Sequence, residues 1–244
     1  MLRRHGSAAG LALLALGSLA APAAASCGAA FCTVNTSWNT QTPLTDSGTR
    51  LDLRFEFIKQ DQPRRGNRDI AVGEIPRHHD EVQTINRNLV LSLDHNFDAN
   101  WGVSVTVPLV DRRHKHVHNH HGGQMPETWD FTELGDIRLL GRYQVQGDNP
   151  ATVHGVLAGV KLPTGDFTVR NEAGDLAERT LQPGTGTTDA LLGGFFHDTL
   201  PIPDSAWFVQ LLGQVPFNER AGFRPGYQLH LDLGYTYQPL PDLA

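Results

Sequence analysis

The residues best suited to chemistry in this chain are histidines, and most of them gather in two places. The segment HKHVHNHH carries five imidazoles, and these are His114, His116, His118, His120 and His121. His78 and His79 come earlier in the chain, directly before the carboxylates of Asp80 and Glu81. Neutral imidazole suits Zn, Cu and Ni, and a tetrahedral site needs three or four ligands. The spacing predicts a transition-metal site drawn from these seven histidines, with a neighbouring carboxylate as a further ligand.

Two other hypotheses fit the same histidines. A solvated, flexible His-rich loop binds metal ions opportunistically, as an expression tag does. Alternatively, the histidines gain charge below about pH 6.5 and act as a pH-sensitive lid. No other feature of the sequence calls for a cofactor.

The elements that must position these histidines follow a period of two. In residues 89–97 and again in residues 101–110, apolar side chains alternate with small or polar ones, and Asp98-Ala99-Asn100 forms a short polar turn between them. Such alternation places one set of side chains on each face of a strand. Each strand has the length that a tilted strand needs to cross a bilayer. The segment therefore predicts an antiparallel hairpin of a transmembrane β-barrel.

The same pattern recurs along the chain and predicts an all-β fold, an antiparallel transmembrane β-barrel with about eight visible strands that belongs to a larger barrel. The expected strands are residues 49–59, 82–97, 101–110, 134–145, 151–162, 188–199, 206–217 and 227–238. Residues 60–81, 111–132 and 163–187 are expected to be long loops that alternate with short turns. That asymmetry is typical of outer-membrane barrels. The alternative is a soluble barrel or sandwich.

The two faces of the expected strands carry different residues. Aromatic side chains near the short turns predict a periplasmic girdle, and they are Phe97, Trp101, Tyr143, Trp207, Tyr235 and Tyr237. The polar face is expected to line a lumen through Arg54, Glu56, Asp94, Asp136, Arg138, Arg142, His230 and Asp232. These charges either set the selectivity of a pathway or pair with one another.

The N-terminal part of the chain indicates export. Residues 1–25 have a basic start, an apolar core and a small-residue cleavage site, which together predict a signal peptide for Sec-type export. Residues 26–48 are expected to be a periplasmic lead-in segment, and residues 49–244 the barrel domain. Cys27 and Cys32 predict a small local disulfide in an oxidising compartment. The alternative is a lipoprotein acylated on Cys27.

Composition and motifs exclude several classes of function. The net charge of −6 argues against a nucleic-acid partner. The sequence lacks G-x-S-x-G, H-E-x-x-H and P-loop motifs, so we do not expect an enzyme. An outer-membrane hydrolase that uses serine and histidine is kept as an alternative, because such sites cannot be recognised from sequence alone.

Three short segments of the chain are similar to segments found in a known protein family. They are Leu134-Gly135-Asp136, Leu162-Pro163-Thr164-Gly165 and Gly184-Thr185-Gly186-Thr187-Thr188-Asp189. In this order, over residues 85–238, the chain resembles the outer-membrane proteins grouped as "MetA-pathway of phenol degradation". The resemblance implies an outer-membrane channel for small, aromatic or hydrophobic molecules. Members are usually longer, and residues 238–244 repeat the pattern of the turn at residues 200–206. We therefore expect a chain truncated at its C-terminus, and an eight-stranded closure is the second option.

The sequence thus predicts a passive channel or transport-related barrel in the outer membrane of a Gram-negative bacterium. Its expected partners are outer-membrane lipid and a small-molecule solute, and its oligomeric state is left open. A surface or periplasmic metal-binding protein that acts through the histidines is the alternative from a different class.

Overall fold

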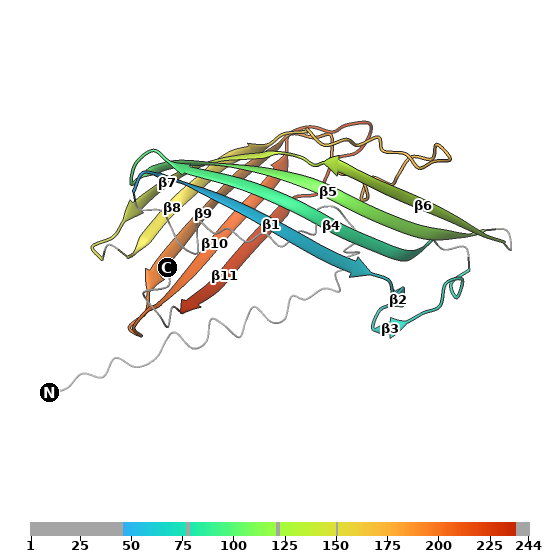
Figure 1. Ribbon diagram of the computed structural model, residues 1–244, viewed down its shortest axis with the longest axis horizontal. Coiled ribbons are helices and arrows are strands. Elements are labelled where there is room, and N and C mark those ends of the chain that lie inside the picture. The colour runs from blue at the N-terminus through green and yellow to red at the C-terminus, as the bar shows by residue number, and fades with distance from the viewer. Residues whose placement is uncertain (1–45, 77–78, 121–122, 150, 238–244) are drawn as a thin grey trace.

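The described part of the chain is an antiparallel β-sheet curled into a half-barrel (Figure 1). The computed structural model describes residues 46–76, 79–120, 123–149 and 151–237. The predicted signal peptide, residues 26–45 of the predicted lead-in segment and both cysteines lie outside these residues. The strands are β1 (Gly48–Gln60), β2 (Arg64–Arg65), β3 (Arg68–Asp69), β4 (His79–Asn96), β5 (Trp101–His120), β6 (Gly123–Leu134), β7 (Arg138–Gln146), β8 (Val153–Lys161), β9 (Asp189–Thr199), β10 (Ser205–Pro216) and β11 (Gln228–Tyr237).

The strands follow one another around the curl in nearly the order of the sequence. The hydrogen-bonded path is β1-β4-β5-β7-β8-β9-β10-β11, and β6 pairs with β5 beside it. Short turns join β4 to β5, β7 to β8 and β9 to β10 at the same end of the sheet (Figure 1). The prediction of an all-β antiparallel fold with eight consecutive strands is confirmed. Among the described residues, no helix is long and apolar enough to span a membrane.

The alternation of apolar and polar residues along each strand places them on opposite faces of the sheet. Every strand in the path has some outward side chains that remain exposed, such as Leu53 and Leu91. The strand register places Leu53, Leu91 and the half-buried Val107 in one row across the sheet. Inward side chains are mostly buried and polar over β4 and β5, for example Asn86 and Asp94. Over β8, β9 and β10 the inner face also carries an apolar cluster, formed by Val153, Leu157, Leu191, Phe195 and Leu212.

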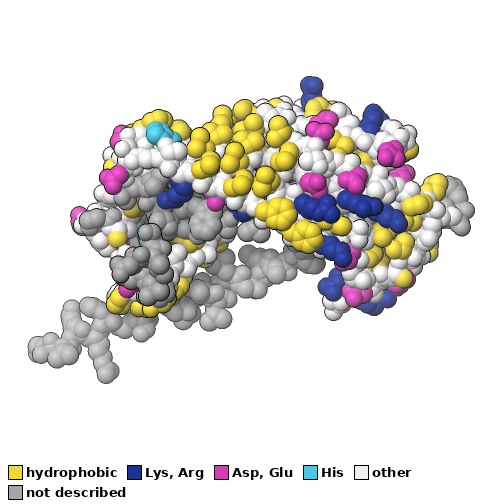
Figure 2. Space-filling model, viewed as in Figure 1, with side chains coloured by type: hydrophobic (Ala, Val, Ile, Leu, Met, Phe, Trp, Pro, Cys, Tyr) yellow, Lys and Arg dark blue, Asp and Glu magenta, His cyan; other side chains and the backbone are white. Residues whose placement is uncertain are grey.

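Figure 2 shows hydrophobic side chains gathered over the middle of the curled sheet, with Lys, Arg, Asp and Glu toward the end where β4, β5 and β6 extend. The exposed large hydrophobic residues include four on β1, three on β4 and three leucines on β11. Period-two alternation alone produces this outcome, because each strand places its two residue classes on opposite faces.

Two predicted loops are partly strand, and the prediction of long loops at residues 60–81 and 111–132 is corrected on this point. β5 continues to His120, and β6 returns from Gly123 to pair with it through residues 123–134. β4 starts at His79, and residues 64–69 form the small hairpin β2–β3. Histidine at every second position from His114 is itself an alternating pattern, so the hydrogen-bonded ladder continues beyond the apolar part of the strands.

The connection between β8 and β9, residues 162–188, is held by one buried charged network. Lys161 Nζ contacts Asp136 Oδ2 at 2.7 Å and Asp189 Oδ2 at 3.4 Å, and it donates to the Thr187 carbonyl at 2.8 Å. The two oxygens of Asp136 also accept the backbone N–H groups of Gly165 and Thr185 at 3.1 and 2.9 Å. The network fixes both ends of this connection to the start of β7.

The three segments that carry the family resemblance meet in this network. Thr164 Oγ1 accepts the Ile137 N–H and donates to the Gly135 carbonyl. Gly165 and Gly184 approach so closely that a Cβ on Gly184 would lie 2.2 Å from the Gly165 carbonyl oxygen. Only glycine allows this backbone approach. The segments therefore have a structural role, which is to seat residues 162–188 against the sheet.

Candidate functional site

The candidate site lies on the inner face of the three-stranded extension formed by β4, β5 and β6. In the strand register, His79 on β4 is paired with His118 on β5, and His116 on β5 is paired with Glu127 on β6. Directly paired residues share a face, so these four side chains point the same way. The sheet therefore brings together residues from three separate stretches of sequence.

A β-bulge in β4 puts His79 on that face. Glu81 pairs with His116 and Gln83 with Lys115, so Val82 is the extra residue in β4. Inward positions are even-numbered after the bulge, at Thr84 for example, and a regular strand would turn His79 outward. An extra residue in one strand shifts the parity of its side chains, and bulges often re-aim a side chain next to a functional site.

The ring nitrogens of the three histidines converge. His118 Nε2 lies 3.0 Å from His79 Nε2 and 3.0 Å from His116 Nε2. His79 Nε2 also contacts His118 Nδ1. Glu127 offers one oxygen to each neighbouring ring, with Oε2 3.1 Å from His116 Nε2 and Oε1 3.3 Å from His118 Nε2. Ligand atoms of His79, His116 and His118 all lie within 4.8 Å of one another.

Residues 175–181 of the β8–β9 connection cover the extension. Trp129 Nε1 donates to the Asp175 carbonyl at 3.1 Å, and Arg112 Nη1 donates to the Leu181 carbonyl at 2.8 Å. Trp129 packs with Ala177 and Leu181 in a small apolar cluster. Glu178 Oε1 lies 3.4 Å from His79 Nδ1, the ring nitrogen that faces away from the other histidines. The covering segment thus contacts the histidines directly.

The remaining predicted ligands have different positions. His114 is buried on the same face, but its Nδ1 is hydrogen-bonded to Thr84 Oγ1 at 2.8 Å, and it lies outside the convergent group. His120 ends β5, and its side chain is not described. His78 and His121 lie outside the described residues.

Burial affects the protonation of two histidines in this extension. Desolvation lowers the pKa of His116, although its hydrogen bond to Glu127 acts in the opposite direction. Desolvation, with the nearby His116 and Arg112, lowers the pKa of His114 from 6.5 to about 4. Both rings therefore become protonated only at a lower pH than a histidine in water would.

The lowered pKa of His114 makes the stability of the metal-free protein dependent on pH. As pH falls below 6.5, the unfolded chain takes up a proton at His114 that the folded chain does not bind until about pH 4, so stability is lost over this window. The loss contributed by His114 should reach about 2 kcal/mol at pH 5. Urea unfolding in detergent with EDTA, at pH 7.5 and pH 5, measures it.

The variant His114→Gln should show a smaller loss between the two pH values than the wild type. His154→Gln, at an exposed position near the short turns, is the control and should keep the wild-type dependence. Equal pH dependence in wild type and His114→Gln would contradict the assignment.

The structure places the eight predicted lumen residues on the inner side of the sheet, where several contact one another or close neighbours. Arg54 Nε lies 3.0 Å from Glu56 Oε1, and Gln210 Nε2 donates to Asp232 Oδ2 at 3.2 Å. Asp94 accepts from Ser104, and Arg142 donates to Asn96. Arg138 and His230 face inward in register with Lys161 and Leu212. Asp136 belongs to the Lys161 network, so its position is that of a structural anchor.

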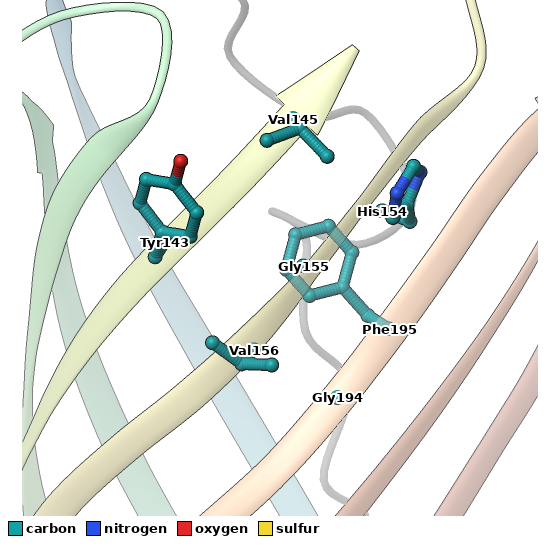
Figure 3. Close-up of a pocket in the computed structure, with 7 residues that line it drawn as sticks. All are labelled: Tyr143, Val145, His154, Gly155, Val156, Gly194 and Phe195. Carbon is teal, nitrogen blue, oxygen red and sulfur yellow. The ribbon is translucent and has the colours of Figure 1, made fainter. Parts of the chain in front are cut away.

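A shallow hollow lies among β7, β8 and β9, toward the short turns (Figure 3). Its lining is mostly apolar or glycine, with Tyr143, Val145, His154, Gly155, Val156, Gly194 and Phe195. Tyr143 and Val156 are directly paired and exposed on the outward face. With one imidazole as its only titratable group besides a phenol, the hollow offers little for catalysis, and the histidine group is the better candidate.

Sequence reasoning missed Glu127, Glu178 and the role of Arg112. Glu127 falls within the predicted loop at residues 111–132, yet the alternation of Glu127, Trp129 and Phe131 is typical of a strand. Glu178 and Arg112 act through contacts between segments far apart in the chain, and no local pattern encodes these contacts.

No protein-family model matches the chain, and no curated protein matches it.

Proposed function

We propose that this chain forms the wall of an outer-membrane β-barrel that passes small solutes. The observation that carries the proposal is the exposed apolar face, to which every strand of the eight-strand path contributes. Soluble monomers rarely expose contiguous apolar patches larger than a few hundred Å². Fully burying one Leu or Phe side chain is worth about 1.5–3 kcal/mol, and lipid would supply that burial along every strand.

The residues at the ends of the strands also support a membrane location, and they indicate how the barrel would be oriented in the membrane. Phe97, Trp101, Tyr235 and Tyr237 are exposed near the short turns, and the Trp101 and Tyr143 rings are 4.7 Å apart between centroids. Aromatic belts of this kind mark the membrane interface. Charged residues gather at the opposite end, over the extension (Figure 2). With short turns in the periplasm, the histidine group would lie at the outer mouth.

A bilayer requires the sheet to be closed. Within the described residues, β1 and β11 are edges, and unpaired backbone groups in hydrocarbon each cost several kcal/mol. We infer that further strands pair with both edges in the assembled barrel. β1 and β11 run in opposite directions, because seven antiparallel pairings separate them, so the edges can also accommodate an antiparallel closure.

The inner face indicates which solutes would pass. It is polar and charged over β4 and β5, and over β8, β9 and β10 it also carries the apolar cluster that contains Leu157 and Phe195. A pathway with both kinds of surface suits small amphipathic or aromatic molecules. This agrees with what the family resemblance implies.

Location and conductance test the proposal together. The mature chain should fractionate with the outer membrane, require detergent, and conduct ions in planar bilayers. Asp94 and Asp232 are inward carboxylates outside the Lys161 network, and fixed charge in a pore sets the local concentration of counter-ions. The double variant Asp94→Asn/Asp232→Asn should therefore shift selectivity toward anions.

The matched control removes two carboxylates from short turns, Asp148→Asn/Asp204→Asn, and should leave selectivity unchanged. A folded, detergent-free monomer in the periplasmic fraction would refute the membrane assignment. Membrane insertion without conductance would refute the solute pathway alone.

A further inference from the structure

We propose that His79, His116, His118 and Glu127 bind a divalent transition metal ion, with Zn²⁺ as the best fit. Three imidazoles and one carboxylate are a tetrahedral donor set that zinc commonly takes. The site is independent of solute passage, because it lies in the extension beyond the apolar part of the strands.

The spacing of the donor atoms fits a single ion. Zinc bonds to nitrogen and oxygen are about 2.0–2.2 Å long, so ligands at the corners of a tetrahedron lie about 3.3–3.6 Å apart. The Nε2 atoms of the histidines are separated by 3.0 Å in two pairs, and the Glu127 oxygens lie 3.1 and 3.3 Å from the rings. A small expansion of the group would hold the ion at normal bond lengths.

The orientation of His79 supplies a second argument. Its Nε2 lies 3.0 Å from His118 Nε2, and its ring stacks on that of His116, while its Nδ1 lies 3.4 Å from Glu178 Oε1. Histidines that bind metals usually donate their other ring N–H to a carboxylate, which fixes the ring and makes the ligating nitrogen more basic. Glu178 is thus a positioning residue. It lies in the β8–β9 connection, which the Lys161 network holds against the sheet.

The scaffold distinguishes this site from opportunistic binding by a His-rich segment. Each donor sits on a strand whose register is defined, and the Val82 bulge turns His79 onto the inner face. The His116 side chain is 4% exposed and that of Glu127 is 30% exposed, so the group is largely shielded yet reachable from solvent. An ion can therefore enter from the outer mouth and exchange.

Isothermal calorimetry with Zn²⁺ tests the proposal on the full chain, folded in detergent at pH 7.5 after treatment with EDTA. His79→Ala is the decisive variant, because His79 is remote in sequence from the HKHVHNHH segment. It should weaken binding at least about tenfold, as should Glu127→Gln, and His116→Ala/His118→Ala should abolish it. Glu178→Gln should weaken binding about tenfold by releasing the His79 ring.

The control is His154→Ala/His197→Ala, which removes two histidines near the short turns and should leave the affinity unchanged. Co²⁺ provides a second readout, since tetrahedral Co²⁺ absorbs visible light far more strongly than octahedral Co²⁺, and this absorption should weaken in His79→Ala. Wild-type affinity in His79→Ala and Glu127→Gln would mean that the HKHVHNHH segment binds ions by itself, and it would overturn the proposal. Neither result depends on conductance, so this proposal and the proposed channel can fail separately.

Discussion

Replacing Lys161 by methionine should reduce the free energy of unfolding by about 3–5 kcal/mol, the usual cost of removing one partner from a buried ion pair. Lys161 and Asp189 are 4% and 1% exposed in their side chains, and Asp136 also contacts the ammonium group. Methionine would remove the ammonium group that contacts both buried carboxylates. Urea unfolding in detergent micelles, followed by tryptophan fluorescence, measures the loss.

Lys59→Met is the matched control for that measurement. Lys59 makes an ion pair with Asp61 at 2.5 Å, but both side chains are nearly half exposed. Exposed pairs contribute about 0–1 kcal/mol, so this variant should be close to wild type. A double variant, Lys161→Met/Asp189→Asn, should recover part of the loss because it removes one stranded charge. Equal effects of the two lysine substitutions would refute the anchoring role of the network.

Replacing Leu91 by arginine should destabilise the protein in phospholipid vesicles by about 2–4 kcal/mol. Leu91 is in the apolar part of β4, is 40% exposed on the outward face, and lies between Leu53 and Val107 in the register. If lipid covers this face, the guanidinium must be buried in hydrocarbon or drawn to the interface. If water covers the face, the substitution costs little.

Ile202→Arg provides the comparison, because it also replaces an exposed aliphatic side chain by arginine. Ile202 is 53% exposed, but it lies in the short turn between β9 and β10, outside the strands of the sheet. A surface substitution of this type usually stays within about 0.5 kcal/mol. Equal, small effects at both positions would argue that the outward face is solvated, and the barrel would then be a soluble one.

The amino-acid sequence was sufficient for the class of fold and the order of its strands. The alternation of Leu89, Leu91 and Leu93 with small or polar residues, and its repetition through eight segments, predicted the path from β1 to β11. Periodicity of this kind is local, since each strand shows both of its faces in its own sequence. The ends of β5 and β6 were missed because the apolar signal stops while the hydrogen-bonded ladder continues.

For the candidate site, too, the sequence determined one part and the tertiary structure another. The sequence by itself determined which residue types were available for metal binding, and it grouped His79 with His116 and His118 across a large separation in the chain. Only the tertiary structure decided that His79, His116 and His118 converge while His114 lies outside their group. The Val82 bulge reverses the face of His79, β6 supplies Glu127, and the Lys161 network presents Glu178. Each of these depends on pairing between distant segments, which is set by the register of a whole sheet and by burial of charge. Local alternation, as in residues 127–131, can indicate a strand, but it does not show which strand is its partner.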